Sequence, residues 1–294
     1  APDGTGVSSN IKTYSHMMFQ SVFDYPFASS SANHLYDITA GYSTNSTLDG
    51  RVLEVSASKK NNIYNEMSQF LVGFDQTGSI ERFDKDGDLT GGEKIDEVVV
   101  VNLARLLSKD GIQKGTFNLE LGVSASDIGF LSPMAARVKI QDLNGTSSFK
   151  VNSPKGEYGI LYANNSLGTP ISGPSYAGST TETTAPVGLI YYQAGVAVLS
   201  ASMFMSTTDG GIMSGTTIWT SSSADGRDIH EAFTSGSIND LSDGLRYRWH
   251  NMSFNNTTIL NSAMYTCRIA SRDFNYSANP TYLTGSKIRV KADD

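Results

Sequence analysis

The sequence predicts a mainly β fold, with sandwich-like or barrel-like sheets and a few short helices. Charged residues make up only 17% of the chain, against roughly 25% in an average soluble domain, while 39% of the residues are hydrophobic. Ser, Thr, Asn and Gly replace the missing charges, and these residues favour the turns that join short strands. Short apolar stretches recur between such turns, as expected for a series of antiparallel strands.

The first part of the chain is expected to begin with a flexible arm, because residues 1–10 are small and polar. The clearest helix is predicted over Lys59–Val72, with Gly73 at the position of a C-terminal cap. Its buried face is expected to consist of four apolar residues at helical spacing: Ile63, Met67, Phe70 and Leu71. A hairpin is predicted between the turn signals at 76–78 and 86–88.

Three further stretches of the first part predict strands. The four consecutive valines of Glu97–Leu107 indicate a strand buried on both faces. In Gly115–Val123, apolar residues alternate with polar ones, which indicates a strand with one buried face. The Asn144-Gly145 pair predicts a hairpin between the strands on either side of it, and EYGILYANN forms a last strand.

The second part of the chain is expected to begin after a polar loop or boundary at 166–186, which is rich in Gly, Pro, Ser and Thr. This loop divides the chain into two mainly β parts with one helix each, 11–165 and 187–294. The apolar stretch Val187–Met205 predicts two buried strands around Gln193-Ala194-Gly195. A helix is predicted over Ser237–Trp249, and a capping box of Ser237 and Asp240 starts it. Its apolar face would contain Ile238, Leu241, Leu245 and Trp249.

The net charge and the lengths of the apolar runs argue against two classes of partner, nucleic acids and membranes. The net charge is -7 and no basic stripe is present, so a nucleic-acid partner is not expected. The most apolar stretch, Val187–Met205, is interrupted by Gln193, two glycines, two tyrosines and two serines. No uninterrupted apolar run therefore reaches the length of about 18 residues that a membrane span needs, and no membrane partner is expected. The single cysteine, Cys267, excludes an intrachain disulfide, and its neighbours predict a strand in which it is a small buried residue.

The acidic stretch FDKDGDLTGGEKIDE (Phe83–Glu97) is the clearest candidate for a metal site. Asp84, Asp86 and Asp88 occupy the first, third and fifth positions of a calcium-binding loop counted from Asp84. The sixth position, where such loops carry Gly, is then Leu89, and the twelfth, where they carry Glu, is Ile95.

The alternative count of the same stretch begins at Asp86. It places Gly91 at the sixth position and Glu97 at the twelfth, but Thr90 then takes the fifth position, where a carboxylate is expected. Neither count completes the pattern. The sequence therefore predicts a solvated acidic turn and no metal site, with a weakly held ion as the alternative.

Signals of catalysis are sparse, so the chain is expected to be non-enzymatic, with no catalytic residues and no cofactor. The four histidines have no metal-ligand spacing, and neither a G-x-S-x-G nucleophile motif nor a phosphate-binding loop occurs. A Ser-His-Asp triad stays open, since its members assemble in space. The 14 Tyr and 13 Phe residues fit either a packed core or an exposed surface that stacks on carbohydrate.

The C-terminal segment Phe254–Lys291 contains the run FNYSANPTY at 274–282. Together with Ala32–Ser43, Val151–Asn165 and Gly188–Leu199, it resembles virion structural proteins of contractile-tailed phages, particularly marine and cyanobacterial myoviruses. The resemblance covers most of the chain and implies a structural subunit of the tail or baseplate. It implies location in the virion after assembly in the host cytoplasm, with other virion proteins and copies of the same chain as partners. It carries no catalytic residues.

Two alternatives to this function stay open, a head or neck component and a carbohydrate-binding or receptor-binding module. Within FNYSANPTY, Asn279-Pro280 favours a turn, and the aromatic rings would anchor that turn against the same chain or another subunit. The possible interface or turn anchors are Phe274, Asn275, Tyr276, Asn279, Pro280 and Tyr282.

Overall fold

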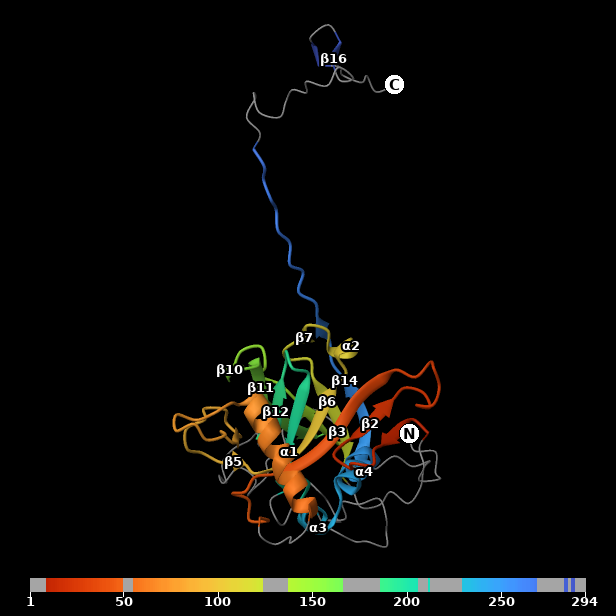
Figure 1. The fold of residues 1–294 in the computed structure, drawn as a ribbon. Coiled ribbons are helices and arrows are strands. Elements are labelled where there is room, and N and C mark those ends of the chain that lie inside the picture. The colour runs from red at the N-terminus through yellow and green to blue at the C-terminus, as the bar shows by residue number, and fades with distance from the viewer. Residues whose placement is uncertain are drawn as a thin grey trace. The chain divides into compact units, whose positions relative to one another are not determined.

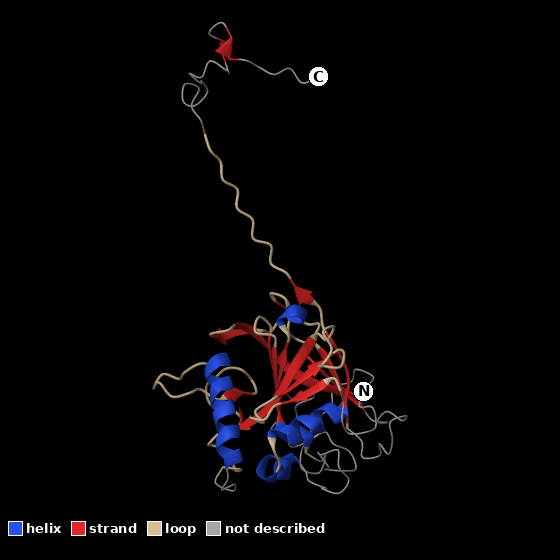
Figure 2. Ribbon diagram, turned by 45° about the vertical axis from the view of Figure 1, so that its right-hand side comes forward, coloured by secondary structure: helices blue, strands red, loops and turns tan. Residues whose placement is uncertain are grey.

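The computed structural model describes residues 9–49, 55–123, 137–165, 186–205, 211, 229–268, 283–284 and 287–288. The chain divides into two compact units, 1–258 and 259–294. The first unit is mainly β with a few short helices, which confirms the predicted fold class (Figures 1 and 2). Among the described helices, none combines the length and the apolar character needed to cross a membrane.

One antiparallel sheet of 11 strands forms the framework of the first unit. Its order is β1-β2-β3-β6-β13-β12-β11-β9-β8-β14, and β10 also pairs with β11. The strands are β1 (Ile11–Thr13), β2 (Gln20–Phe23), β3 (His34–Tyr42), β6 (Glu97–Leu103), β8 (Asn118–Gly122), β9 (Arg137–Gln141), β10 (Lys150–Ser153), β11 (Gly156–Asn165), β12 (Pro186–Tyr191), β13 (Val196–Ser200) and β14 (Trp249–Ser253).

Smaller elements complete the described chain. Two-stranded pairs are formed by β4 (Phe83–Asp84) with β5 (Lys94–Ile95), by β7 (Gly111–Ile112) with β15 (Asn256–Thr257), and, in the second unit, by β16 (Leu283–Thr284) with β17 (Lys287–Ile288). The helices are α1 (Val55–Leu71), α2 (Arg105–Ser108), the 3-10 helix η1 (Ala201–Phe204), α3 (Ile229–Ser235) and α4 (Ile238–Arg248).

The sheet continues across the boundary that the sequence predicted at 166–186. β11 precedes this stretch and β12 follows it, yet the two strands pair directly, with Tyr158 opposite Tyr191. β13 then pairs with β6, so strands from both predicted parts alternate in one sheet. The structure therefore shows one β unit where the sequence predicted two parts, because these long-range pairings join them. Residues 166–185 lie outside the described residues.

Two hydrophobic cores cover the two faces of the central strands. In β6, Val99 and Val101 belong to the larger core, and Val98 and Val100 belong to the smaller one. All four side chains are buried, which confirms the predicted two-sided burial. α3 and α4 pack against the larger core, while α1 packs against the smaller one. The sheet curls around the larger core, so that Trp249 of β14 stacks on Tyr36 of β3 with ring centroids 4.6 Å apart.

Helix α1 confirms one predicted helix and corrects its buried face. It begins at Val55, four residues earlier than expected, and Gly73 follows its end with φ +100°. Ile63 and Leu71 are buried as predicted, but Phe70 is 48% exposed. Phe70 lies at the flank of the helix, where its ring contacts the Lys155 ammonium at 3.8 Å instead of the core. Tyr64, which was not among the residues predicted for the buried face, belongs to the smaller core.

Helix α4 begins with the predicted capping box. The Ser237 hydroxyl accepts the N–H of Asp240 at 3.2 Å, and the Asp240 carboxylate accepts the N–H of Ser237 at 2.7 Å. Ile238, Leu241 and Leu245 are buried as expected. The helix ends at Arg248, so Trp249 starts β14 and is not a helical residue.

This cap makes a measurable contribution to stability. We expect Ser237→Ala to lower the free energy of unfolding by about 1 kcal/mol, because it leaves an N-terminal N–H of α4 without its acceptor. Urea denaturation measures the effect. Ser235→Ala is the control, since that hydroxyl donates only to the Glu231 carbonyl of its own helix and its loss should cost less than about 0.5 kcal/mol. Equal losses in the two variants would contradict the capping role.

The predicted hairpin around Asn144-Gly145 is wrong. β9 pairs with β8 and β11, and β10 pairs only with β11 among the described strands. The reason lies in Asp142, which follows β9 and is buried. Its carboxylate accepts the N–H groups of Gly115 at 2.6 Å and Phe117 at 3.0 Å. These bonds tie the chain after β9 to the segment that precedes β8, and Gly145 does not adopt the positive φ that a tight hairpin turn needs.

The predicted arm at 1–10 is described only at its end. Residues 1–8 lie outside the described residues. Ser9 and Asn10 are bonded to the sheet region, because the carbonyl of Asn10 accepts the N–H of Phe23 at 2.9 Å and the carbonyl of Ser9 accepts the N–H of Phe27 at 3.0 Å. The arm is therefore held at its junction with β1.

Candidate functional site

The acidic stretch forms a small hairpin with a buried base. Phe83 of β4 pairs with Ile95 of β5, and both side chains are buried in the smaller core. Asp84 pairs with Lys94, and the loop between them contains the predicted turn, with Gly87 at φ +70°. The turn at 76–78 closes a separate bridge between Phe74 and Ile80. The turn at 76–78 is thus closed by its own bridge, and the turn at 86–88 lies in the loop between β4 and β5. The hairpin predicted between the two turn signals is therefore wrong.

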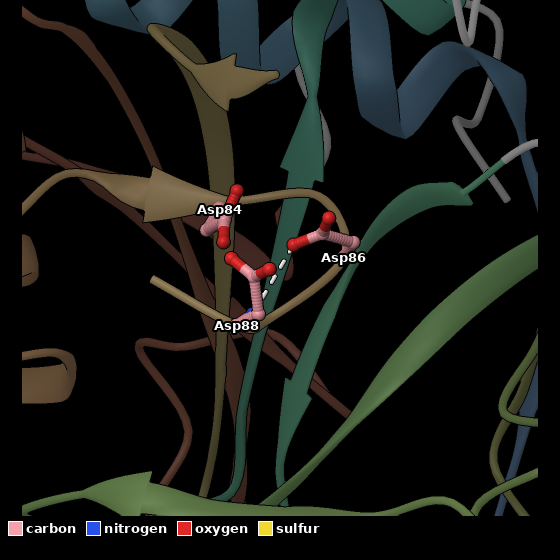
Figure 3. Close-up of side chains that lie close together, drawn as sticks. All are labelled: Asp84, Asp86 and Asp88. Atoms are coloured by element: carbon pink, nitrogen blue, oxygen red, sulfur yellow. Dashed lines mark hydrogen bonds between the residues drawn. The ribbon is translucent and has the colours of Figure 1, made fainter. Parts of the chain in front are cut away.

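Three carboxylates converge inside this loop (Figure 3). The side chains of Asp84, Asp86 and Asp88 each place one oxygen within 4.8 Å of the oxygens of the other two. Asp86 and Asp88 are exposed, whereas Asp84 is only 1% exposed. The prediction of a fully solvated turn is therefore wrong for Asp84, because the base of the hairpin is docked on the core.

Backbone N–H groups hold each carboxylate by one oxygen. Asp84 accepts the N–H of Leu89 at 2.8 Å through Oδ2. Asp86 accepts the N–H of Asp88 at 3.1 Å, and Asp88 accepts the N–H of Thr90 at 2.8 Å, each through Oδ1. In this conformation Leu89 has φ +64°, which is uncommon for a residue with a side chain. The leucine side chain packs against the smaller core and helps to hold this backbone conformation.

The second oxygen of Asp84 lacks such a donor. Its Oδ1 is buried and has no hydrogen-bond partner within the described part of the chain. Lys94 lies on the side of the other oxygen, with its Nζ 3.8 Å from Asp84 Oδ2 and 3.4 Å from Glu81 Oε1. Burial raises the pKa of Asp84 to about 6. The neighbouring Asp86 carboxyl adds to this shift, and the hydrogen bond from the Leu89 N–H opposes it.

Asp142 shows what a satisfied buried carboxylate looks like in the same fold. It is as buried as Asp84. Its Oδ1 accepts the N–H of Phe117, and its Oδ2 accepts the N–H of Gly115 and the hydroxyl of Tyr192 at 3.1 Å. Both oxygens of Asp142 are therefore used by the protein itself, which separates it from Asp84.

A Ser, an Asp and a His meet at the edge of β3, but in the wrong order for nucleophilic catalysis. Asp37 Oδ1 accepts the Ser21 hydroxyl at 2.6 Å and lies 2.7 Å from His34 Nε2. The carboxylate thus stands between the hydroxyl and the ring, whereas in a catalytic triad the imidazole stands between them and takes the hydroxyl proton. Ser21 is also buried. The arrangement is a polar contact between β2 and β3.

The other histidines lie in separate elements. His16 lies between β1 and β2, where its Nδ1 accepts the N–H of Met18 at 3.1 Å. His230 belongs to α3 and contacts Met205. His250 belongs to β14, with its Nε2 2.6 Å from Arg137 Nη1.

Most described tyrosines belong to the cores and not to a stacking surface. Six of them are buried: Tyr36, Tyr42, Tyr64, Tyr158, Tyr191 and Tyr192. A smaller aromatic group lies near the surface before β2, where the ring of Phe19 lies 4.8 Å from Tyr14 and 5.1 Å from His16. The sequence alone does not distinguish the buried aromatic residues from those near the surface, because tertiary packing decides which of them are buried.

The first residues of the second unit expose large apolar side chains. Leu260 is 89%, Met264 91% and Tyr265 88% exposed. The expected strand around Cys267 is wrong over the described residues 264–268, which form no strand there, and Cys267 is exposed instead of buried. The apolar residues that suggested a strand are present in the sequence, but no described strand pairs with residues 264–268. The predicted anchors Phe274, Asn275, Tyr276, Asn279, Pro280 and Tyr282 lie outside the described residues.

Comparisons of the chain with protein-family models, with curated proteins and with solved structures found no match.

Proposed function

We propose that the chain is a non-enzymatic structural subunit of a tailed-phage virion, in the tail or baseplate, and that residues from Ile259 onward bind a neighbouring subunit. The observation that carries the proposal is the exposure of Leu260, Met264 and Tyr265 in one short segment. Fully burying a large apolar side chain contributes about 1.5–3 kcal/mol. A segment with several such side chains in water therefore gains stability when a partner covers it.

The chain that leads into this segment is held within the first unit. β15 ends the first unit and pairs with β7, with Thr257 opposite Gly111. The segment also belongs to Phe254–Lys291, which contains the core of the motif that resembles phage virion proteins. These two observations support a role as an assembly arm, and a head or neck subunit would use the same arm.

Removal of the arm should abolish association without unfolding the first unit. We expect a chain that ends at Thr258 to keep its melting temperature within a few degrees, because both cores lie before this residue. The full chain should form oligomers at micromolar concentration, or should bind other virion proteins from phage particles, and the shortened chain should not. Sedimentation velocity and binding to dissociated particles measure this difference.

A matched pair of variants distinguishes association through the arm from nonspecific association of exposed apolar side chains. Replacing Leu260, Met264 and Tyr265 by Ser should weaken association. Replacing three exposed apolar residues of the first unit by Ser, namely Met17, Leu106 and Val151, should leave it unchanged. A full chain that stays monomeric and binds no virion protein would contradict the proposal. Antibody labelling of particles distinguishes the tail or baseplate from the head or neck.

A carbohydrate-binding or receptor-binding module is the second candidate. The observation that favours it is the aromatic group of Tyr14, His16 and Phe19 near the surface, because aromatic rings stack on sugars. Saturable binding on a glycan array that is lost in Tyr14→Ala would favour this candidate over the structural subunit.

A further inference from the structure

The donor set in the β4–β5 loop suits a hard divalent cation. Calcium binds six to eight oxygens at about 2.3–2.6 Å. Two oxygens bound to one such ion are therefore at most about 5 Å apart. The oxygens of Asp84, Asp86 and Asp88 lie within 4.8 Å of one another, so a common ion can contact all three. Figure 3 shows the three carboxylates directed into one space.

The buried oxygen of Asp84 is the independent observation that points to a ligand. A carboxylate oxygen that is buried without a donor costs the full desolvation penalty of that group. Asp84 Oδ1 is buried and accepts no hydrogen bond from any described residue. By contrast, both oxygens of the equally buried Asp142 accept hydrogen bonds. A cation in the loop would satisfy Oδ1 directly.

The nearby lysines do not replace such a cation. Lys94 is nearer to Glu81 than to Asp84, and it lies on the Oδ2 side, which already accepts a backbone N–H. Lys85 is bonded to Glu93 at 2.7 Å. Lys94 thus divides its charge between Glu81 and Asp84 Oδ2 without a hydrogen bond to either, and Lys85 is bonded to a glutamate outside the group of three aspartates.

The backbone leaves the free oxygens open to a ligand. A Cβ at Gly92 would lie 3.4 Å from Asp86 Oδ2 and 3.6 Å from Asp84 Oδ1, so the glycine keeps this side of both oxygens free of a side chain. Leu89, at the sixth position from Asp84, has the left-handed conformation that Gly supplies in calcium-binding loops. The twelfth position is Ile95, which is buried and offers no side-chain oxygen.

From these observations we propose that Asp84, Asp86 and Asp88 bind one calcium ion, which fixes the β4–β5 hairpin on the smaller core. The missing twelfth-position glutamate leaves water to complete the coordination and makes the site weak, with a dissociation constant on the order of 10⁻⁴ M. This site is structural and does not depend on the proposed virion function.

The test is a calorimetric titration of the full chain with CaCl₂ after chelation, together with native mass spectrometry. We expect one calcium per chain and a higher melting temperature with calcium. The Asp86→Asn/Asp88→Asn variant should lose at least tenfold in affinity, because it removes two anionic ligands but keeps oxygens that accept the Asp88 and Thr90 N–H groups.

A control in the neighbouring turn isolates the site. Asp75 holds its own turn by accepting the N–H groups of Thr77 and Ser79, both at 2.8 Å, so Asp75→Asn should bind calcium like the unmodified chain. In chelator, the double variant should melt no lower than the unmodified chain, which shows that it folds. The proposal is overturned if the unmodified chain binds no calcium at 10 mM, about 100 times the expected constant, or if the double variant binds equally well.

Discussion

Gly41→Ala is expected to lower the free energy of unfolding by about 3 kcal/mol, the upper end of the usual cost of overpacking a core. Gly41 lies in β3 where α1 crosses the sheet. A Cβ at this position would lie 2.5 Å from the Lys60 carbonyl oxygen and 2.8 Å from the Tyr64 nitrogen. Both atoms belong to the helix backbone, so no side-chain rotation can relieve the contact. The helix would have to move away from the sheet.

Urea denaturation and thermal melting measure this loss. For a chain of this size, a loss of 3 kcal/mol corresponds to a fall in melting temperature of about 6–12 °C. Gly78→Ala is the control, because a Cβ there meets no atom within 4 Å. Its φ of +85° still makes alanine unfavourable, at a cost of about 1 kcal/mol. If Gly41→Ala costs no more than Gly78→Ala, the close approach of α1 to β3 does not limit stability.

The parts of the fold that local sequence determines were predictable. The valines of β6 are buried on both faces because an uninterrupted apolar run fits no other strand position. The capping box of Ser237 and Asp240 needs only residues three apart. The prediction failed where distant partners decide the outcome. The end of β9 is fixed by Asp142 bonding to Gly115 and Phe117, which no local pattern reveals.

The candidate site was visible in the sequence only as an acidic turn. The spacing of Asp84, Asp86 and Asp88 was evident, but the burial of Asp84 was not. That burial follows from Phe83 and Ile95, which dock the hairpin base on the smaller core. The signal that sequence reasoning missed is the pair of apolar residues that flank the acidic run. Because strand side chains alternate between faces, a solvated Asp84 next to a buried Phe83 was a reasonable prediction, and only the structure shows that both positions of β4 are buried.

Lys60 is the second position where a large effect is expected. Its side chain is fully buried in α1. The ammonium donates to the carbonyl of Phe233 and, at 2.8 Å, to that of Gly236. These carbonyls lie at the C-terminal end of α3, where helix carbonyls lack intrahelical donors and carry partial negative charge. Lys60 therefore joins α1 to the corner between α3 and α4.

Lys60→Ala is expected to lower the free energy of unfolding by about 4 kcal/mol. The substitution leaves a cavity and removes the donor of two carbonyls. Lys59→Ala is the matched control, because the Lys59 ammonium donates to the His16 carbonyl at an exposed site, and its loss should cost less than about 1 kcal/mol. Urea denaturation at pH 7 compares the two. Similar losses would show that the buried ammonium does not hold the corner.

The pH dependence of the Lys60 contribution gives a sharper test. Burial lowers the pKa of Lys60 from 10.5 to about 8, although Asp240 opposes the shift. Below pH 8 the folded and unfolded chains both hold the proton. Between pH 8 and 10.5 the unfolded chain holds the proton that the folded protein has lost, so folding becomes more favourable as pH rises.

The stability of the unmodified protein should therefore rise, relative to the Lys60→Met variant, by up to about 1.4 kcal/mol per pH unit in this window. The Met variant keeps most of the buried stem but has no proton to lose. Burial also raises the pKa of Tyr36 to about 12, but this residue is the same in both proteins, so its effect cancels in the difference. Parallel urea denaturation at pH 7 and pH 9.5 measures the gap between the two proteins. If the gap is the same at both pH values, the Lys60 ammonium keeps an ordinary pKa, and the corner between α3 and α4 is held without the cost of burying a charge.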